Sequence, residues 1–103
     1  MISLTKSLAL EQAPHDIRVN AICPGFLWTR AWEGLATGMQ MRIPQYADRD
    51  PRDIFLEVVK NGVPLGREQT PEDIGNLATF LASPGARNIT GQAISVDGGI
   101  TLR

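Results

Sequence analysis

Two short apolar segments rich in β-branched residues, 17–23 and 92–96, are separated along the chain by segments with clear helix signals. This order of strand, helical connection and strand is typical of a βαβ unit with parallel strands and a right-handed crossover. Parallel sheets are covered on both faces and usually contain more than two strands. The sequence therefore predicts an α/β fold, in which these two strands form the end of a larger doubly wound parallel sheet.

The first predicted helix runs from Ile2 to about Ala13, where good helix formers dominate, and Pro14 ends it. Its apolar residues fall on two faces, which predicts a helix that is buried on two sides. The first face holds Met1, Leu4 and Leu8, and the second holds Ile2, Ala9 and Ala13.

Two further helices have well-marked starts. Asp50 is a candidate N-cap before Pro51, and Thr70 is a candidate N-cap before Pro71. Asn61-Gly62 marks the end of the first of these helices, and Ser83-Pro84-Gly85 stops the second. The inner faces expected for the two helices are Ile54, Phe55, Val58 and Val59, and Ile74, Leu77, Ala78 and Leu81.

Apart from the helix after Asp50, residues 26–65 are the least regular part of the sequence. Large apolar side chains lie there among Gly34, Gly38 and Pro44. This mixture favours a mobile cover over a tightly packed core. The large apolar residues are Phe26, Leu27, Trp28, Trp32, Leu35, Met39, Met41 and Ile43.

Charge and cysteine content exclude several classes of protein. The chain has 103 residues, a formal net charge of −1 and a pI near 5.7, so it has no basic field to hold a nucleic acid or an anionic membrane. No apolar run approaches the ~20 residues of a membrane span, and no secretory signal pattern follows Met1. The single Cys23 suits a reducing compartment, so we expect a cytoplasmic protein.

The loop after the first strand is the candidate binding site, since open α/β sheets bind ligands at the carboxyl ends of their strands. Pro24 fixes the chain direction, and Gly25 lacks a Cβ, which allows a flat ring or a phosphate to approach the backbone. Leu27 can offer its backbone N–H and C=O to a carboxamide, and the Thr29 hydroxyl can donate or accept. An alternative stays open, in which Pro-Gly is a simple turn and Thr29 is a helix N-cap.

Four segments occur in order over nearly all of the chain: Ser7-Leu8-Ala9-Leu10-Glu11; Ile17-Arg18-Val19-Asn20-Ala21-Ile22-Cys23-Pro24-Gly25 with Thr29 four residues on; Thr70-Pro71-Glu72-Asp73-Ile74; and Thr90-Gly91-Gln92-Ala93-Ile94-Ser95-Val96-Asp97-Gly98-Gly99. With this order and spacing, the chain resembles the back half of a short-chain dehydrogenase/reductase. The resemblance implies the C-terminal part of a Rossmann-like doubly wound parallel sheet, with two strands and about four helices. Residues 1–103 would then be a single partial domain with a lid segment at about 30–65.

In that family, the Pro-Gly-x-x-x-Thr loop holds the nicotinamide end of NAD or NADP, and a lid covers the substrate. The resemblance therefore implies cofactor binding by Pro24, Gly25, Phe26, Leu27 and Thr29. It implies a substrate lid that contains Trp28, Trp32, Leu35 and Met39, although these residues could instead pack against the body or a partner chain. It also implies a small-molecule alcohol or ketone substrate, and a homo-oligomer formed through the first helix and the last strand.

The family's catalytic residues have no counterpart in this sequence. The family's catalytic acid is a Tyr with a Lys four residues later. The only tyrosine of this sequence is Tyr46, and Asp50 stands at the position four residues later. Family spacing places that pair about three to seven residues before Met1, so we expect a longer reading frame. We thus expect a fragment of an NAD(P)-dependent oxidoreductase that interconverts an alcohol and a carbonyl, inactive by itself. Whether the chain is itself an enzyme stays open.

The alternative is a non-catalytic interaction module that docks onto full-length relatives, and turnover without a partner chain would distinguish the two. The serines lack a Gly-x-Ser-x-Gly setting, and no His/Cys cluster has metal spacing, so we expect neither a serine nucleophile nor a metal. Arg18 and Asn20 alternate with apolar residues, which favours structural roles with polar partners. Asp97 could hold a metal beside its two glycines, but the resemblance implies a structural role.

Overall fold

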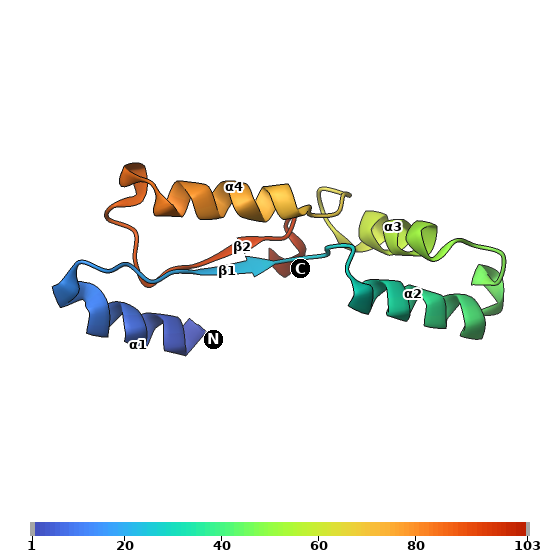
Figure 1. Ribbon diagram of the computed structural model, residues 1–103. Coiled ribbons are helices and arrows are strands. Elements are labelled where there is room, and N and C mark those ends of the chain that lie inside the picture. Colours follow the sequence, from blue (N-terminus) through green and yellow to red (C-terminus); the bar gives the residue numbers. More distant parts are fainter. Residues whose placement is uncertain (1, 103) are drawn as a thin grey trace. The chain divides into compact units, whose positions relative to one another are not determined.

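The computed structural model describes residues 2–102, which form two compact units. The first unit comprises Met1–Pro24 and Pro71–Val96, and the second comprises Gly25–Thr70 and Asp97–Arg103. The chain passes from the first unit to the second at the end of one strand, returns before the last long helix, and passes again after the other strand (Figure 1).

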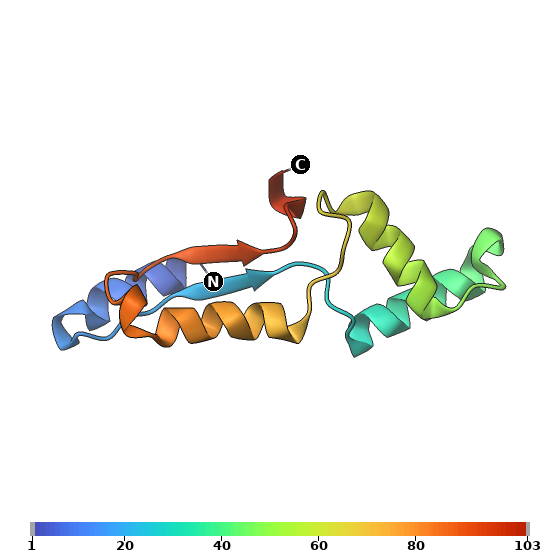
Figure 2. The same ribbon diagram turned by 90° about the horizontal axis from the view of Figure 1, so that it is seen from above.

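The first unit is a two-stranded parallel sheet with a helix on each side. Strands β1 (Ala21–Pro24) and β2 (Ala93–Val96) run side by side in Figure 1 and Figure 2. Helices α1 (Ile2–Gln12) and α4 (Pro71–Ala82) lie on opposite faces of this sheet (Figure 1). The parallel pairing confirms the predicted α/β class.

Both strands are shorter than predicted. The Ala21 N–H donates to the Gln92 C=O at 2.8 Å, and Ala21 pairs with Ala93 as the first residue of the ladder. Just before this point, the Val19 N–H donates to the Thr90 hydroxyl at 3.1 Å. Residues 17–20 are therefore held by loop contacts and lie outside the sheet.

The sequence predicts that one side of helix α1 lies on the sheet and the other against a neighbouring helix or subunit; within the described residues only one side is buried. Thr5 and Ala9 are its buried residues, whereas Leu4 is 61% exposed and Leu8 is 36% exposed. The reason is that no described segment packs on the outer face of the helix. Met1, which was expected on that face, lies outside the described residues, and Ala13 lies in a short 3-10 helix, Ala13–His15.

The second unit contains α2 (Arg30–Arg42) and α3 (Pro51–Gly62), with short 3-10 turns at Pro44–Tyr46 and Ile100–Leu102. The expectation of an irregular segment before Asp50 is wrong, because α2 fills much of it. Two interior glycines, each costing a helix roughly 0.5–1 kcal/mol relative to alanine, concealed this helix in the sequence.

The second unit has its own core, so the expectation that this segment has no tightly packed core is wrong, whereas its role as a mobile cover stays a prediction. Phe55, Val59 and Val63 are at most 2% exposed and form one cluster. Fully burying one such side chain contributes roughly 1.5–3 kcal/mol, so this cluster orders the segment. The partly buried side chains that pack on the cluster are Phe26, Trp28, Trp32 and Ile100.

The two helices with marked starts are confirmed. The Asp50 carboxylate accepts a hydrogen bond from the Arg52 N–H at 2.8 Å, and α3 begins at Pro51. Helix α4 begins at Pro71 and ends before Ser83. Of the expected inner faces, Ile54, Phe55, Val59 and Leu81 are buried, Val58, Ile74 and Leu77 are half-buried, and Ala78 is exposed. Among residues 2–102, no helix is long and apolar enough to cross a membrane.

Candidate functional site

The candidate loop begins at the carboxyl end of β1, as predicted. Pro24 is the last residue of the strand and lines a hollow of about 540 Å³ in the first unit. Ile2 and Ser3 of α1 lie in the same hollow, together with Ile22 and Cys23. Ligands of open α/β sheets bind at this end of the strands.

Gly25 follows Pro24 and packs closely against Gln69 and Asp97. A Cβ added at Gly25 would lie 2.5 Å from Gln69 Oε1 and 2.7 Å from Asp97 Cα. The second contact is with backbone, which cannot swing aside as a side chain can. The missing Cβ is therefore required for internal packing, a reason that the sequence did not reveal.

The backbone of Phe26 is held on both sides by Gln69. The Phe26 N–H donates to Gln69 Oε1 at 2.8 Å, and the Gln69 N–H donates to the Phe26 C=O at 2.9 Å. Gln69 is 5% exposed, and its Nε2 donates to the Arg67 C=O at 3.2 Å. Sequence reasoning missed Gln69, because it lies 43 positions after Phe26 and a contact at that separation leaves no local pattern.

Leu27 is half-buried, and no described residue hydrogen-bonds to its backbone N–H or C=O. Both groups are thus available to a ligand. Thr29, by contrast, is the N-cap of α2. Its hydroxyl accepts from the Trp32 N–H at 3.3 Å, and its C=O accepts from the Glu33 N–H at 2.8 Å. The alternative reading of Thr29 as a cap is confirmed, and its exposed hydroxyl can still donate a hydrogen bond to a ligand.

Trp28 and Trp32, both expected in a substrate lid, pack against the core of the second unit. Their ring centroids lie 5.1 Å and 5.0 Å from that of Phe55. The Phe26 ring stands edge-on to Trp32 at 5.3 Å. The structure thus brings Phe26, Trp28 and Trp32 together in one aromatic cluster, which extends from the loop into the core.

Arg52 closes this cluster from the other side. Its guanidinium lies 5.3 Å from the Trp28 ring centroid and 5.6 Å from that of Phe55. Arg52 Nη2 pairs with Glu68 Oε2 at 2.6 Å, whereas Nη1 is buried without a partner among the described residues. The loop residue Trp28 is therefore held by stacking on both a phenyl ring and a cation.

Leu35 and Met39, the other two expected lid residues, lie apart from the aromatic cluster, on the surface of α2. They line a hollow of about 330 Å³ together with Gly34, Gly38, Arg42 and Ile43. Leu35 is 54% exposed and Met39 is half-buried. These two side chains offer apolar surface to solvent or to a ligand.

Asp97 binds backbone amides of its own turn. Its Oδ1 accepts from the Gly99 N–H at 2.9 Å and its Oδ2 from the Thr101 N–H at 3.3 Å. The Gly99 hydrogen bond, followed by the Thr101 hydroxyl, lowers the pKa of Asp97 below its usual value, although burial opposes this. Gly98 has a φ of +64°, which favours glycine in this turn. The expected structural role of Asp97 in closing the strand is confirmed.

The lowered pKa predicts loss of stability in acid. Since the folded-state pKa lies below the ordinary value of ~3.9, ionised Asp97 stabilises the fold above that pH, and this contribution disappears as the pH falls through the folded-state pKa. We expect Asp97→Asn to flatten the dependence of the urea unfolding midpoint on pH between pH 5 and 2. The exposed Asp48→Asn is the control for removal of one carboxylate. Parallel curves for wild type and Asp97→Asn would contradict the assignment.

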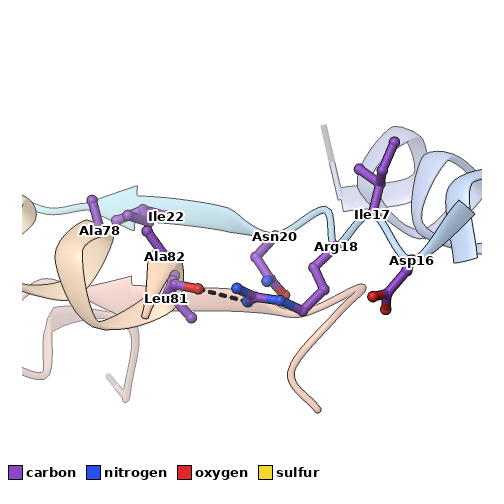
Figure 3. Close-up of a pocket in the computed structure, with 8 residues that line it drawn as sticks. All are labelled: Asp16, Ile17, Arg18, Asn20, Ile22, Ala78, Leu81 and Ala82. Carbon is purple, nitrogen blue, oxygen red and sulfur yellow. Dashed lines mark hydrogen bonds between the residues drawn. The ribbon is translucent and has the colours of Figure 1, made fainter. Parts of the chain in front are cut away.

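A second hollow of the first unit, of about 520 Å³, lies between β1 and α4 (Figure 3). Arg18 reaches across it, and its Nη1 donates to the Leu81 C=O at 2.6 Å (Figure 3). Asn20 Nδ2 donates to the Ile89 C=O at 3.0 Å, and its Oδ1 accepts from the Gln92 N–H at 3.1 Å. Polar partners satisfy both side chains, so their predicted structural roles are confirmed.

Residues 2–102 contain no group of three or more His, Cys, Asp or Glu side chains that could hold a metal ion. Cys23 is half-buried beside Pro24, and His15 is exposed. The candidate site is therefore a backbone loop with one exposed hydroxyl and aromatic support.

Comparison with known proteins identifies relatives of this chain. A family model described as enoyl-(acyl carrier protein) reductase matches residues 1–101. Oxidoreductase UcpA of Escherichia coli O157:H7 is 42% identical over 102 residues, which cover 99% of this chain and 36% of UcpA. The diacetyl reductase [(S)-acetoin forming] of Staphylococcus epidermidis strain RP62A is 39% identical over 101 residues, covering 98% of this chain and 38% of the reductase.

A solved structure shares the fold. The crystal structure of YwfH, an NADPH-dependent reductase involved in bacilysin biosynthesis, superposes with a TM-score of 0.76 at 33% identity. The match covers 96% of this chain and 35% of YwfH. The chain thus spans little more than a third of the length of each of these proteins.

Proposed function

The chain belongs to the short-chain dehydrogenase/reductase family. On this basis, we propose that it is the C-terminal part of an NAD(P)-dependent oxidoreductase that interconverts an alcohol and a carbonyl. Its contribution is the loop Pro24–Thr29, which would hold the nicotinamide end of the cofactor. The observation that carries the proposal is that no described residue binds the backbone N–H or C=O of Leu27, in the loop that follows the carboxyl end of β1.

The donor set of this loop fits a nicotinamide carboxamide, which carries an acceptor oxygen and a donor NH₂ group. The Leu27 N–H and C=O have no partner in the described chain and match those two groups. The Phe26 N–H and C=O cannot take this role, because both are bound to Gln69. The exposed Thr29 hydroxyl adds a third polar group two residues further on.

When bound, NAD(P) supplies the hydride acceptor or donor. The residues of this chain orient the ring: Leu27 would bind the carboxamide, Thr29 would add a hydrogen bond, and the fixed backbone of Phe26 would keep both in place. Pro24 and Gly25 bring the loop to the strand end and against Asp97. Holding reactants in one orientation lowers the barrier, even when no proton moves through these groups.

The proton of the reaction must move through other residues. The 103 residues contain no Tyr-x-x-x-Lys pair, and Tyr46 is followed four residues later by Asp50. We therefore propose that the chain is inactive by itself and works with a segment that carries the acid and the rest of the cofactor site.

Of the four residues expected in the substrate lid, two pack on the core of the second unit and two lie around a hollow on α2. Trp28 and Trp32 stabilise the core through Phe55, so the surface they offer to a substrate is limited. Leu35 and Met39, around the hollow on α2, are the apolar lid residues with accessible surface.

The implied substrate is a small molecule, and the implied location is cytoplasmic.

Two surfaces of the first unit could be covered by other parts of a larger protein, one by an added strand and the other by a second subunit. Ile22 lines the hollows on both the α4 side and the α1 side of β1, so an added parallel strand would fill both. The exposed Leu4 and Leu8 of α1 fit a second subunit, and the proposed homo-oligomer would use this helix and the last strand. The same surfaces favour the second candidate function, a non-catalytic module that docks onto full-length relatives.

A chimaera tests the proposed function. Residues 1–103 replace the matched segment of the Staphylococcus epidermidis diacetyl reductase, which supplies the remaining part of a full-length protein. Cofactor binding is measured by titration with NADH and NADPH, and activity by diacetyl-dependent loss of nicotinamide absorbance. Binding and turnover support the proposal, and a folded chimaera that binds neither cofactor contradicts it.

Thr29→Val in this chimaera is expected to raise the cofactor dissociation constant about tenfold, since a lost hydrogen bond to a polar group costs ~0.5–1.5 kcal/mol or more when buried. The substitution also removes the N-cap of α2, so two controls accompany it. Thr29→Ser keeps both the hydroxyl and the cap, whereas Thr29→Asp keeps the cap without a donor. An unchanged dissociation constant for Thr29→Val would remove Thr29 from the site.

A further inference from the structure

We propose that Gln69 is a positioning residue of the nicotinamide loop: by binding both backbone groups of Phe26, it fixes the direction of the Leu27 peptide. The inference rests on the function proposed above. Gln69 lies outside the loop and does not face the ligand directly, so its effect would pass through the loop backbone.

The hydrogen bonds form a closed pair between two residues. Gln69 Oε1 accepts from the Phe26 N–H at 2.8 Å, and the Gln69 N–H donates to the Phe26 C=O at 2.9 Å. Gln69 is 5% exposed and Phe26 is half-buried, so the Gln69 side of the pair is shielded from water. Two hydrogen bonds from one buried residue restrain the backbone of Phe26.

The Gln69 side chain is itself confined. Its Nε2 donates to the Arg67 C=O at 3.2 Å, which fixes which end of the amide faces Phe26. A Cβ on Gly25 would lie 2.5 Å from Oε1, and one on Gly98 would lie 3.0 Å from Nε2. The absence of a Cβ at both glycines therefore leaves enough space for the Gln69 amide. The close packing also restricts rotation of this amide.

The consequence for the ligand follows from the peptide that Phe26 and Leu27 share. The Phe26 C=O and the Leu27 N–H belong to one planar unit, so the hydrogen bond from the Gln69 N–H to the Phe26 C=O also fixes the direction of the Leu27 N–H. No described residue binds the Leu27 N–H or C=O, so both groups are left to the carboxamide. If the Gln69 bonds are lost, the loop can rotate, and a misplacement of about 1 Å can cost as much as ~10²-fold in rate.

Three variants of the chimaera separate positioning from stability. Gln69→Met keeps the length of the side chain but offers Phe26 no oxygen acceptor. Gln69→Glu keeps the acceptor and loses the donor to Arg67. The matched control is Gln40→Met, because Gln40 Nε2 also donates to a backbone carbonyl, that of Arg49 at 2.8 Å, within the same unit and away from the loop.

Cofactor KM, diacetyl KM, kcat and melting temperature are measured for each variant. We expect Gln69→Met to raise the cofactor KM about tenfold and to lower kcat, with a smaller change in diacetyl KM. Gln69→Glu should melt at a lower temperature, because it buries a carboxylate, yet keep the cofactor KM within about twofold of the parent. Gln40→Met should lower the melting temperature alone.

Wild-type kinetics for Gln69→Met, or equal impairment of Gln69→Met and Gln69→Glu, would overturn the positioning role while the proposed function stands. A folded parent chimaera without cofactor binding would overturn both. Hydrogen exchange of the 103-residue chain provides a second measurement that needs no cofactor: the Phe26 amide should be protected in the wild type and exchange at least about tenfold faster in Gln69→Met. Equal exchange would contradict the hydrogen-bonded pair.

Discussion

The purified 103-residue chain is expected to produce no turnover of NAD(H) or NADP(H) with any alcohol or ketone. General acid catalysis alone contributes ~10²–10⁴-fold, and the chain has no Tyr-x-x-x-Lys pair to supply it. An absorbance assay of the nicotinamide over a panel of alcohols and ketones measures this directly.

The controls for this assay are a heat-killed sample and the chimaera with diacetyl reductase. The chimaera should turn over under conditions in which the chain alone does not. Turnover by the chain above the heat-killed level would show that its own residues suffice for proton transfer, and would contradict the division of roles proposed for the loop and a second, acid-bearing segment.

Gly25→Ala is expected to give the largest loss of stability and of cofactor binding among single substitutions in the loop. The new Cβ would lie 2.7 Å from both Cα and Cβ of Asp97, so the strand end, the loop or the Asp97 turn must shift. Overpacking of this kind costs about 1–3 kcal/mol, and the same shift displaces Leu27. We expect a lower melting temperature for the chimaera and a cofactor dissociation constant raised by at least about tenfold.

Gly38→Ala is the matched control, because a Cβ at Gly38 of α2 meets nothing within 4 Å. This substitution should stabilise the second unit by roughly 0.5–1 kcal/mol, since alanine favours the helix. If Gly25→Ala kept both the melting temperature and the dissociation constant of the parent, the close packing of Gly25 on Asp97 would be wrong.

Elements with local signals were predicted well. Asp50 and Pro51 fix the start of α3 through a cap and a preset φ, and these effects act within a few residues. The two strands were found because β-branched residues cluster in them, although their ends were set by long-range bonds such as that from Val19 to Thr90.

Features that depend on distant partners were missed. Helix α2 contains Gly34 and Gly38, which lower its propensity, and Thr29 at its start reads equally well as a ligand group. Gln69 was missed because a glutamine before a helix carries no pattern, and its role arises only where the loop, the Arg67 segment and the Asp97 turn meet. Of the candidate site, the loop could be identified from the sequence, whereas the residues that hold it could not.

A crystal structure of the chimaera with NAD⁺ or NADP⁺ shows whether the loop Gly25–Thr29 holds the nicotinamide ring. We expect the carboxamide to lie within hydrogen-bond distance, about 2.7–3.2 Å, of the Leu27 backbone groups, with Phe26 still bound to Gln69. A cofactor bound with its nicotinamide away from Gly25–Thr29, or a Leu27 peptide turned from the ring, would contradict this expectation.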